Sequence, residues 1–232
     1  MKPRVLILHT LGTNRDEDAA AAFAMAGAEP CIVPIVELKQ RRKPWSDYQL
    51  LMLPGGFSYA DALGAGRLWA LDLQSYFADE LEAYVGGGRP VLGICNGFQA
   101  LVRAGVLPGD GVQATLTHNE TGRFECRWVT IRPHLTSLWT AELAAIDCPI
   151  AHGEGNFQLG DPSASVKVAF TYAVNPNGSH GGAAGVSNGA GNVLGLMPHP
   201  ENHIYPWQHP HYPRGYRGNL GLPLFQAGVK HA

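Results

Sequence analysis

The segment that most constrains the fold of this chain is Pro90-Val-Leu-Gly-Ile-Cys-Asn-Gly-Phe-Gln99. Its first half is a short apolar run without helical spacing, which is typical of a buried strand. Asn96–Val102 then begins a helix, so the chain must turn sharply at Cys95. The small residues on either side, Gly93 and Gly97, permit such a turn, as in the Gly-x-Ser-x-Gly elbow of hydrolases. The segment predicts a strand–turn–helix unit of an α/β fold.

Strand and helix signals alternate through the first half of the chain. Acidic residues at 16–18 suit the positive end of a helix dipole, and Gly27 suits a left-handed helix cap. The expected elements are the strands Val5–Leu8, Cys31–Val36 and Tyr48–Leu53 and the helices Asp16–Met25 and Leu71–Val85. Strands that alternate with helices predict a doubly wound, mostly parallel sheet with its site at the carboxyl edge.

The second half favours strands. Phe124–Ile131 alternates polar and apolar residues, as a half-buried antiparallel strand does. Turn-rich clusters bracket a short strand at Ala183–Val186, and Asn192–Met197 is a final strand that leads into Pro198-His-Pro-Glu201. We expect the segment after Glu201 to be an irregular arm. With no repeat or linker in the sequence, residues 1–232 are expected to form one domain with an added antiparallel portion.

Composition excludes several classes of function. The 232 residues are 45% hydrophobic and 16% charged, with a formal net charge of −2. This balance provides no basic field for nucleic acid or an anionic membrane. No apolar run approaches the roughly 20 residues of a membrane span, and the start of the chain does not resemble a signal peptide. Four scattered cysteines indicate free thiols, so the chain is expected to be cytoplasmic.

Cys95, His199 and Glu201 form a chemically complete set for nucleophilic catalysis. A sulfur at a helix N-terminus is favoured as the thiolate. Histidine ordinarily titrates near neutral pH, so His199 is the natural proton carrier. Glu201 lies on the same side of an extended segment and can orient the imidazole. Spacing does not establish the contact between Cys95 and His199, because it is long-range.

Gly55-Gly56 follows the strand expected to neighbour the one that ends at Cys95. A backbone without side chains lets a substrate approach closely. The N–H of Gly56, together with the N–H of Asn96 just after the nucleophile, is a candidate oxyanion hole. One such donor typically contributes about 3 kcal/mol to transition-state stabilisation.

With these residues in place, the chain resembles class I (triad-type) glutamine amidotransferases, and within them the glutaminase subunits of phosphoribosylformylglycinamidine synthase. The resemblance extends along nearly the whole chain. It rests on Gly12-Thr-Asn14, Leu53-Pro-Gly-Gly-Phe-Ser-Tyr-Ala-Asp61, Gly93-Ile-Cys-Asn-Gly-Phe-Gln99, Gly122-Arg-Phe-Glu-Cys-Arg-Trp128, Ala151-His-Gly-Glu-Gly-Asn-Phe157, Asn175-Pro-Asn-Gly-Ser179 and Gly195-Leu-Met-Pro-His-Pro-Glu201. It departs from the family at Arg15 and Ala60, where such subunits often have Cys and Gly.

The resemblance implies a flavodoxin-like fold and assigns roles by position. Cys95 is the nucleophile, His199 the general acid and base, and Glu201 its partner. Gly56 and Asn96 are the oxyanion donors, and Gln99 matches a position that contacts bound glutamine. The loop His152-Gly-Glu-Gly155 is expected to border the same pocket.

The implied reaction is hydrolysis of L-glutamine to glutamate and ammonia through a cysteine thioester. The ammonia passes to a larger synthase subunit, which uses ATP and Mg²⁺ to convert formylglycinamide ribonucleotide to formylglycinamidine ribonucleotide in purine biosynthesis. A small accessory subunit is a further expected partner. This chain itself is expected to hold no cofactor or metal, and its glutaminase activity is expected to be low without the partner.

Three alternatives stay open on the residues alone. The histidines at 199, 203, 209 and 211 are a possible zinc or nickel site, although prolines and aromatics surround them. A cysteine peptidase or other hydrolase can use a similar elbow. A binding subunit can retain the scaffold without the chemistry. Cys31, Cys126 and Cys148 are expected to be packing residues.

Overall fold

The computed structural model describes residues 1–134 and 137–232. Over these residues, nine strands form one mixed sheet in the order β2-β1-β3-β4-β11-β10-β9-β6-β7, and β5 pairs with β8. The strands are β1 (Arg4–His9), β2 (Glu29–Pro34), β3 (Leu50–Leu53), β4 (Val91–Ile94), β5 (Ala114–Thr117), β6 (Glu125–Pro133), β7 (Ile146–His152), β8 (Asn156–Leu159), β9 (Lys167–Tyr172), β10 (Ala183–Ser187) and β11 (Val193–Leu196). The helices are α1 (Asp16–Met25), α2 (Ile35–Lys39), α3 (Arg67–Tyr76), α4 (Ala78–Gly86), α5 (Asn96–Arg103) and α6 (Leu222–Lys230).

One half of the sheet is parallel. β2, β1, β3, β4 and β11 pair in parallel in that order. With β11 as the fifth parallel strand, this is the 2-1-3-4-5 order of flavodoxin-like sheets. The predicted doubly wound fold is confirmed. The order places the carboxyl ends of β3, β4 and β11 side by side.

The other half is antiparallel. β10, β9, β6 and β7 continue the sheet beyond β11. The expected strands near 124–131 and 183–186 appear as β6 and β10, whereas β7 and β9 were not anticipated. The half-buried alternation expected for β6 is weak, because only Ile131 in it is fully buried. The added antiparallel portion is therefore present and larger than the sequence suggested.

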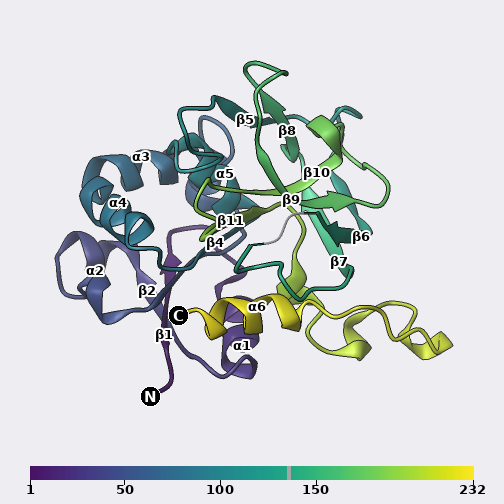
Figure 1. Ribbon diagram of the computed structural model, residues 1–232, viewed down its shortest axis with the longest axis horizontal. Helices are drawn as coiled ribbons and strands as arrows, with labels where there is room; N and C mark the ends of the chain where they lie inside the picture. The colour runs from purple at the N-terminus through teal and green to yellow at the C-terminus, as the bar shows by residue number, and fades with distance from the viewer. Residues whose placement is uncertain (135–136) are drawn as a thin grey trace.

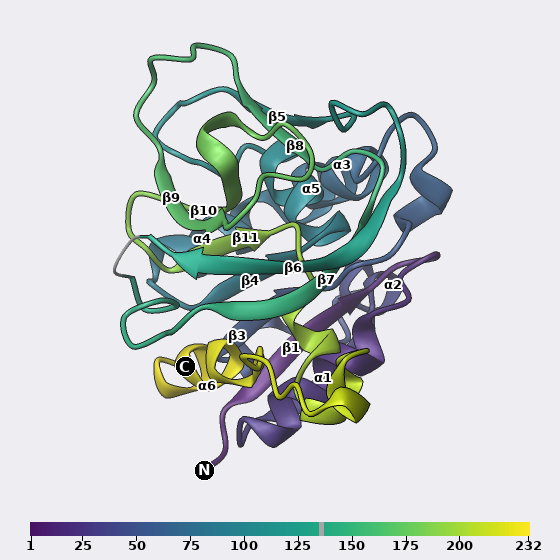
Figure 2. The same cartoon turned by 90° about the vertical axis from the view of Figure 1, so that its right-hand side faces the viewer.

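Helices cover both faces of the parallel half. α1 and α6 lie together on one face, and α3, α4 and α5 lie on the other (Figures 1 and 2). Phe23 of α1 meets Phe225 of α6 edge-to-face, with ring centroids 5.0 Å apart. α5 is buried at every residue from Asn96 to Val102 and contacts β3, β4 and β11. This burial fixes the helix that follows Cys95.

The expected strand Cys31–Val36 is wrong at both ends. β2 spans Glu29–Pro34, and its pairing with β1 ends at Pro34, opposite His9. Beyond His9 the neighbouring strand offers no further backbone partner. The chain instead forms α2, in which Ile35 and Leu38 are buried one turn apart.

The expected helix Leu71–Val85 is two helices. α3 and α4 meet at Phe77, whose φ of −136° and ψ of 19° are not helical. Phe77 is buried and packs against Trp45, with ring centroids 5.6 Å apart. Burial of this ring turns the chain and separates the two helices.

The arm expected after Glu201 is only partly irregular. Residues 203–221 contain short 3₁₀ turns, but Leu222–Lys230 form α6. Pro223 stands in its first turn, and Leu224, Phe225 and Gly228 face inward at helical spacing. The proline in the first turn and the helical spacing of the apolar residues could have predicted this helix from the sequence.

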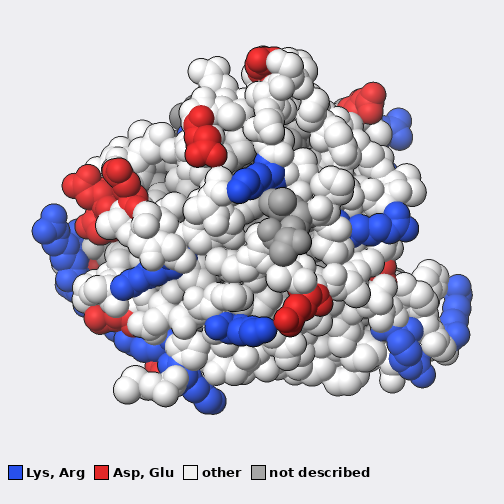
Figure 3. Space-filling view, in the orientation of Figure 1, with Lys and Arg blue, Asp and Glu red and all other residues white. Residues whose placement is uncertain are grey.

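The surface carries charges of both signs. Figure 3 shows Lys and Arg interspersed with Asp and Glu over one face, in line with the net charge of −2. Among residues 1–134 and 137–232, the helices are all too short or too polar to cross a bilayer.

Candidate active site

Three neighbouring parallel strands bring the predicted residues to one edge of the sheet. β3 is followed by Gly55 and Gly56, β4 by Cys95, and β11 by the segment that holds His199. The backbone N–H of Cys95 donates to the carbonyl of Leu196 at 2.7 Å and so ties the ends of β4 and β11 together. This edge is where ligands bind in doubly wound sheets.

Cys95 occupies the sharp turn between β4 and α5. Its φ of 51° and ψ of −106° are strained for a residue with a side chain. A Cβ on Gly97 would lie 2.0 Å from the carbonyl oxygen of Leu53, and one on Gly93 would lie 2.9 Å from that of Gly97. The glycines flanking Cys95 are required because backbones approach closely there. The structure has the elbow that the sequence predicts.

His199 and Glu201 form a buried pair beside Cys95. Nδ1 of His199 lies 2.7 Å from Oε1 of Glu201, and the side chains are 5% and 0% exposed. The Cys95 sulfur is close enough to the imidazole to help raise the pKa of His199. The three residues that the sequence could not connect therefore meet.

The electrostatics of His199 differ from the expectation. The sequence suggested a pKa near neutral pH. Burial lowers the pKa of His199, but the charge of Glu201 and the Cys95 sulfur outweigh burial and raise this pKa to about 10. The imidazole is therefore protonated at neutral pH, ready to donate a proton and to balance a thiolate.

A cavity of about 210 Å³ lies against Cys95. Its lining comes from four segments of the chain: Gly56, Phe57, Asp61, Ala65, Cys95, Gln99, His118, Phe124, Ala151, His152, Gly153 and Glu154. His199 and Glu201 do not line this cavity, so Cys95 is the member of the set of three that faces it. The expectation that the 152–155 loop borders the pocket is confirmed.

Gly55 and Gly56 differ in what they contact. A Cβ on Gly55 would lie 2.7 Å from Cε1 of His199, so the glycine backbone packs directly on the imidazole. Gly56 pairs with Thr13 in an isolated antiparallel bridge. The two hydrogen bonds of this bridge are made by the adjacent residues: the N–H of Asn14 donates to the carbonyl of Gly55, and the N–H of Phe57 donates to the carbonyl of Gly12. The Gly56 N–H takes no part in these two bonds, and Gly56 lines the cavity.

The side chains of Asn96 and Gln99 brace the cavity walls. Asn96 Nδ2 donates to Asp61 at 2.9 Å and to Gln99 Oε1 at 3.1 Å, and Asn96 Oδ1 accepts the Ser58 N–H at 3.0 Å. Gln99 Nε2 donates to the Glu154 carbonyl at 2.7 Å. Gln99 thus lines the cavity and also holds the 152–155 loop, a positioning contact that the sequence did not indicate.

Sequence reasoning missed Asn119. This buried side chain bonds to His152 and to Gly155, at the two ends of the loop on the cavity wall. The sequence around it, Thr117-His-Asn-Glu120, has no periodicity or motif that marks a site. Only its tertiary contacts identify it.

The other cysteines only partly match the expectation of packing residues. Cys148 is buried, and burial, followed by the charges of Glu201 and Asp147, raises its pKa well above the usual range. Cys126 is exposed and Cys31 is half-buried, so packing does not describe Cys126. Cys148 is the inert thiol that the sequence predicted.

The histidine-rich arm is built on aromatic packing. His203 and His209 both pack edge-on against Trp128, with ring centroids 5.0 and 4.3 Å away. His203 Nδ1 donates to the carbonyl of Asp147 at 2.6 Å. Within the described part of the chain, no group of three or more His, Cys, Asp or Glu side chains is arranged to hold a metal ion.

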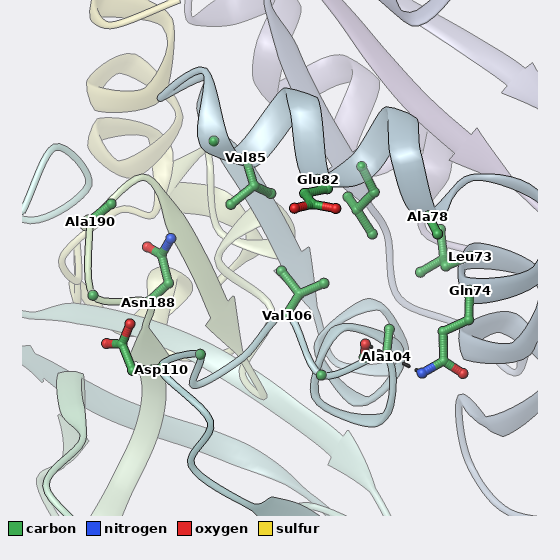
Figure 4. Close-up of a pocket in the computed structure, with 15 residues that line it drawn as sticks. Leu73, Gln74, Ala78, Glu82, Val85, Ala104, Val106, Asp110, Asn188 and Ala190 are labelled. Atoms are coloured by element: carbon green, nitrogen blue, oxygen red, sulfur yellow. Dashed lines mark hydrogen bonds between the residues drawn. The ribbon is translucent and has the colours of Figure 1, made fainter.

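A second cavity, of about 470 Å³, lies at the opposite edge of the sheet. Figure 4 shows Val85 and Val106 on its walls, with Glu82 and Asp110 nearby. Its lining comes from α3, from the length of α4, from the segment that follows α5, and from the turn before β11. The last two segments lie at the amino edge of the parallel strands. Because Cys95 is absent from this lining, the smaller cavity at the carboxyl edge is the candidate active site.

The fold and the Cys95–His199–Glu201 set define a class of protein, the triad-type glutamine amidotransferases. The family model of the CobB/CobQ-like glutamine amidotransferase domain matches residues 2–232.

Similar proteins and a similar solved structure identify the particular family of glutamine amidotransferases. The chain is 48% identical to phosphoribosylformylglycinamidine synthase subunit PurQ of Treponema denticola, an alignment that covers 100% of this chain and 99% of that protein. It is 39% identical to PurQ of Dehalococcoides mccartyi, covering 100% and 98%. Its structure matches a chain in the structure of PurLQS from Thermotoga maritima with a TM-score of 0.84 and 34% identity, covering 100% and 99%. The chain belongs to the glutamine amidotransferases and, among them, to the PurQ family.

Proposed function

We propose that this chain is the glutaminase subunit of a phosphoribosylformylglycinamidine synthase. It hydrolyses L-glutamine to glutamate and ammonia, and the ammonia passes to a synthase subunit that makes formylglycinamidine ribonucleotide. The observation that carries the proposal is the buried His199–Glu201 hydrogen bond, which lies next to the Cys95 sulfur that faces the cavity. End-to-end similarity to PurQ subunits and to a chain of PurLQS supports the particular synthase.

The first chemical step forms a thioester. The Cys95 thiolate attacks the side-chain amide carbon of glutamine, and the carbonyl electrons move onto oxygen. When the C–N bond breaks, His199 gives its proton to the departing nitrogen, which leaves as ammonia. The buried Glu201 stabilises the imidazolium before this transfer.

The second step regenerates the thiolate. A water molecule attacks the γ-glutamyl thioester, and the now neutral His199 takes its proton. The C–S bond breaks, glutamate leaves, and the thiolate–imidazolium pair is restored. The same imidazole thus acts first as acid and then as base.

The oxyanion is held by backbone donors in both steps. We assign this role to the N–H groups of Gly56, on the cavity wall, and of Asn96, the first residue of α5. The N-terminal end of α5 adds the positive end of its dipole. Gln99 lines the same cavity and is assigned to contact bound glutamine.

The remaining chemistry belongs to the partner. Ammonia released into water would be protonated and lost as a nucleophile, so the synthase subunit must receive it through a protected passage. ATP and Mg²⁺ serve that subunit, and a small accessory subunit completes the assembly. We place the complex in the cytoplasm, since all four cysteines of this chain are free thiols.

A nitrogen-source exchange tests the proposal. The chain is combined with its synthase partner, ATP, Mg²⁺ and formylglycinamide ribonucleotide, and formylglycinamidine ribonucleotide is measured with glutamine or with ammonium chloride. Wild type is expected to use both sources, and Cys95→Ala only ammonium. Equal use of glutamine by the variant would contradict the proposal. Cleavage of peptide or ester substrates in preference to glutamine would instead favour the peptidase or hydrolase alternative.

A further inference from the structure

Asn119 lies between β5 and β6, and both the nitrogen and the oxygen of its side-chain amide form hydrogen bonds within the protein. Its side chain is buried, with 2% exposed. Nδ2 donates to the carbonyls of Arg123 and His152, each at 2.8 Å. Carbonyl oxygens only accept, so these two bonds fix which end of the amide is nitrogen. Oδ1 therefore faces Nδ1 of His152 at 3.0 Å and the N–H of Gly155 at 3.1 Å.

This orientation fixes the tautomer of His152. An amide oxygen has no proton to give, so His152 must donate from Nδ1. In the neutral ring, Nε2 is then unprotonated. Nε2 is buried and has no hydrogen-bond partner among the described residues. An unpaired buried acceptor costs free energy, and such atoms in native proteins call for a functional explanation.

The surroundings of His152 keep it neutral. Burial, and next the charge of His199, lower the pKa of His152 to about 4. Glu125 on β6 opposes this shift and Arg127 on β6 adds to it. A second imidazolium here would repel the proton that His199 must carry.

The same contacts shape the cavity wall. Asn119 Oδ1 draws the N–H of Gly155 toward the imidazole, and a Cβ on Gly155 would lie 2.3 Å from Nδ1 of His152. The carbonyl oxygen of Ala151, just before this turn, lies 3.9 Å from Cys95 Sγ. The 152–155 turn therefore adjoins both the nucleophile and the substrate cavity.

We propose that Asn119 is a positioning residue for the glutamine cavity. Asn119 holds His152 as the neutral Nδ1–H tautomer and holds residues 152–155 in the cavity wall. The proposal rests on the proposed glutaminase function. A neutral His152 places no second imidazolium next to His199. Asn119 acts through His152 and the turn, and does not itself touch substrate.

The substitution Asn119→Asp tests this role with little change in size. It replaces the amide nitrogen that donates to two carbonyls with an acceptor, and it places a carboxylate next to Nδ1 of His152. The nearby negative charge raises the pKa of His152, so a new loss of activity is expected as pH falls through the raised value. In the reconstituted synthase complex, kcat/KM for glutamine is expected to fall roughly 100-fold, because the wall shifts relative to Cys95.

The matched control is Asn188→Asp. Asn188 is also buried, and its Oδ1 accepts the N–H groups of Gly191 and Val193 while Nδ2 donates to Asn192. It lies at the opposite edge of the sheet, against the larger cavity. The Asn188→Asp substitution is expected to leave the pH dependence of glutaminase activity unchanged. The same new ionisation in both variants, or in neither, would overturn the proposal.

A measurement on the unmodified protein covers the case in which Asn119→Asp does not fold. Nitrogen and carbon NMR shifts of the His152 ring report its tautomer without any activity. The expected result is a protonated Nδ1 and a bare Nε2 that does not titrate above pH 5. A proton on Nε2, or titration near pH 6.5, refutes the inference. If wild type proves to have no glutaminase activity while this tautomer is found, the proposed function fails instead.

Discussion

The backbone of Gly55 lies directly against the imidazole of His199. A methyl group at Gly55 would come within 2.7 Å of Cε1, although these residues are far apart in the sequence. β3 delivers the glycine and β11 the histidine, with β4 and its Cys95 between them. The Gly55 backbone therefore helps to fix the orientation of the His199 imidazole relative to the Cys95 sulfur.

Gly55→Ala is expected to displace this imidazole. The added methyl group must push His199 away from Glu201 or from Cys95, since the site is buried and closely packed. We expect kcat for glutamine hydrolysis to fall roughly 100-fold, with a smaller change in KM. Steady-state kinetics of the complex measure both. Gly86→Ala is the control, because a Cβ there meets nothing within 4 Å. A Gly55→Ala enzyme with wild-type kcat would contradict this account.

Glu201→Gln is expected to move the pH dependence. After burial, which lowers it, the charge of Glu201 has the largest influence on the pKa of His199 and raises it. In wild type, activity should persist at neutral pH and fall as pH rises toward about 10, where His199 loses its proton. Without the charge, the pKa falls and the alkaline limit moves to lower pH.

The Glu201→Gln variant should also lose roughly 10³- to 10⁴-fold in kcat, as orienting residues of triads do. A pH–rate profile of both proteins measures the shift. An alkaline limit that stays in place would show that Glu201 does not set the charge of His199.

Alkylation separates the reactive thiol from the buried one. A glutamine analogue that alkylates cysteine should label Cys95, which faces the cavity, and spare Cys148, which is buried with a raised pKa. Cys95→Ala should abolish labelling and lower glutaminase turnover by roughly 10⁶-fold. Cys148→Ala should retain both. Mass spectrometry of the labelled peptides gives the site, and a label on Cys148 would be the contrary result.

Partner dependence is a further expectation. Hydrolysis without an acceptor wastes glutamine, so the isolated chain should turn over slowly. Addition of the synthase subunit with its nucleotide substrates should raise glutaminase activity by roughly 5- to 150-fold, the usual range of coupling between sites. Glutamate release with and without the partner measures this ratio. Full turnover by the chain alone would rule out such coupling.

The local parts of the fold were predictable because short-range sequence patterns specify them. The elbow at Cys95 follows from flanking glycines, and the parallel half of the sheet follows from alternating strands and helices. Local sequence patterns predicted the wrong secondary structure where a contact with a residue or strand distant in the sequence determined it. Ile35 and Val36 look like strand, but β1 ends at His9 and gives them no partner. Phe77 looks helical, but its burial against Trp45 divides the helix.

The sequence by itself determined which side chains are capable of the chemistry: a thiol at an elbow, an imidazole, and a carboxylate two positions beyond it. Tertiary structure alone decided that they meet, because adjacent parallel strands join segments about a hundred residues apart. It also decided the charge of each histidine. Glu201 raises the pKa of His199, whereas burial beside that charge lowers the pKa of His152 and Asn119 fixes its tautomer. Protonation depends on neighbours in space, which no local pattern contains.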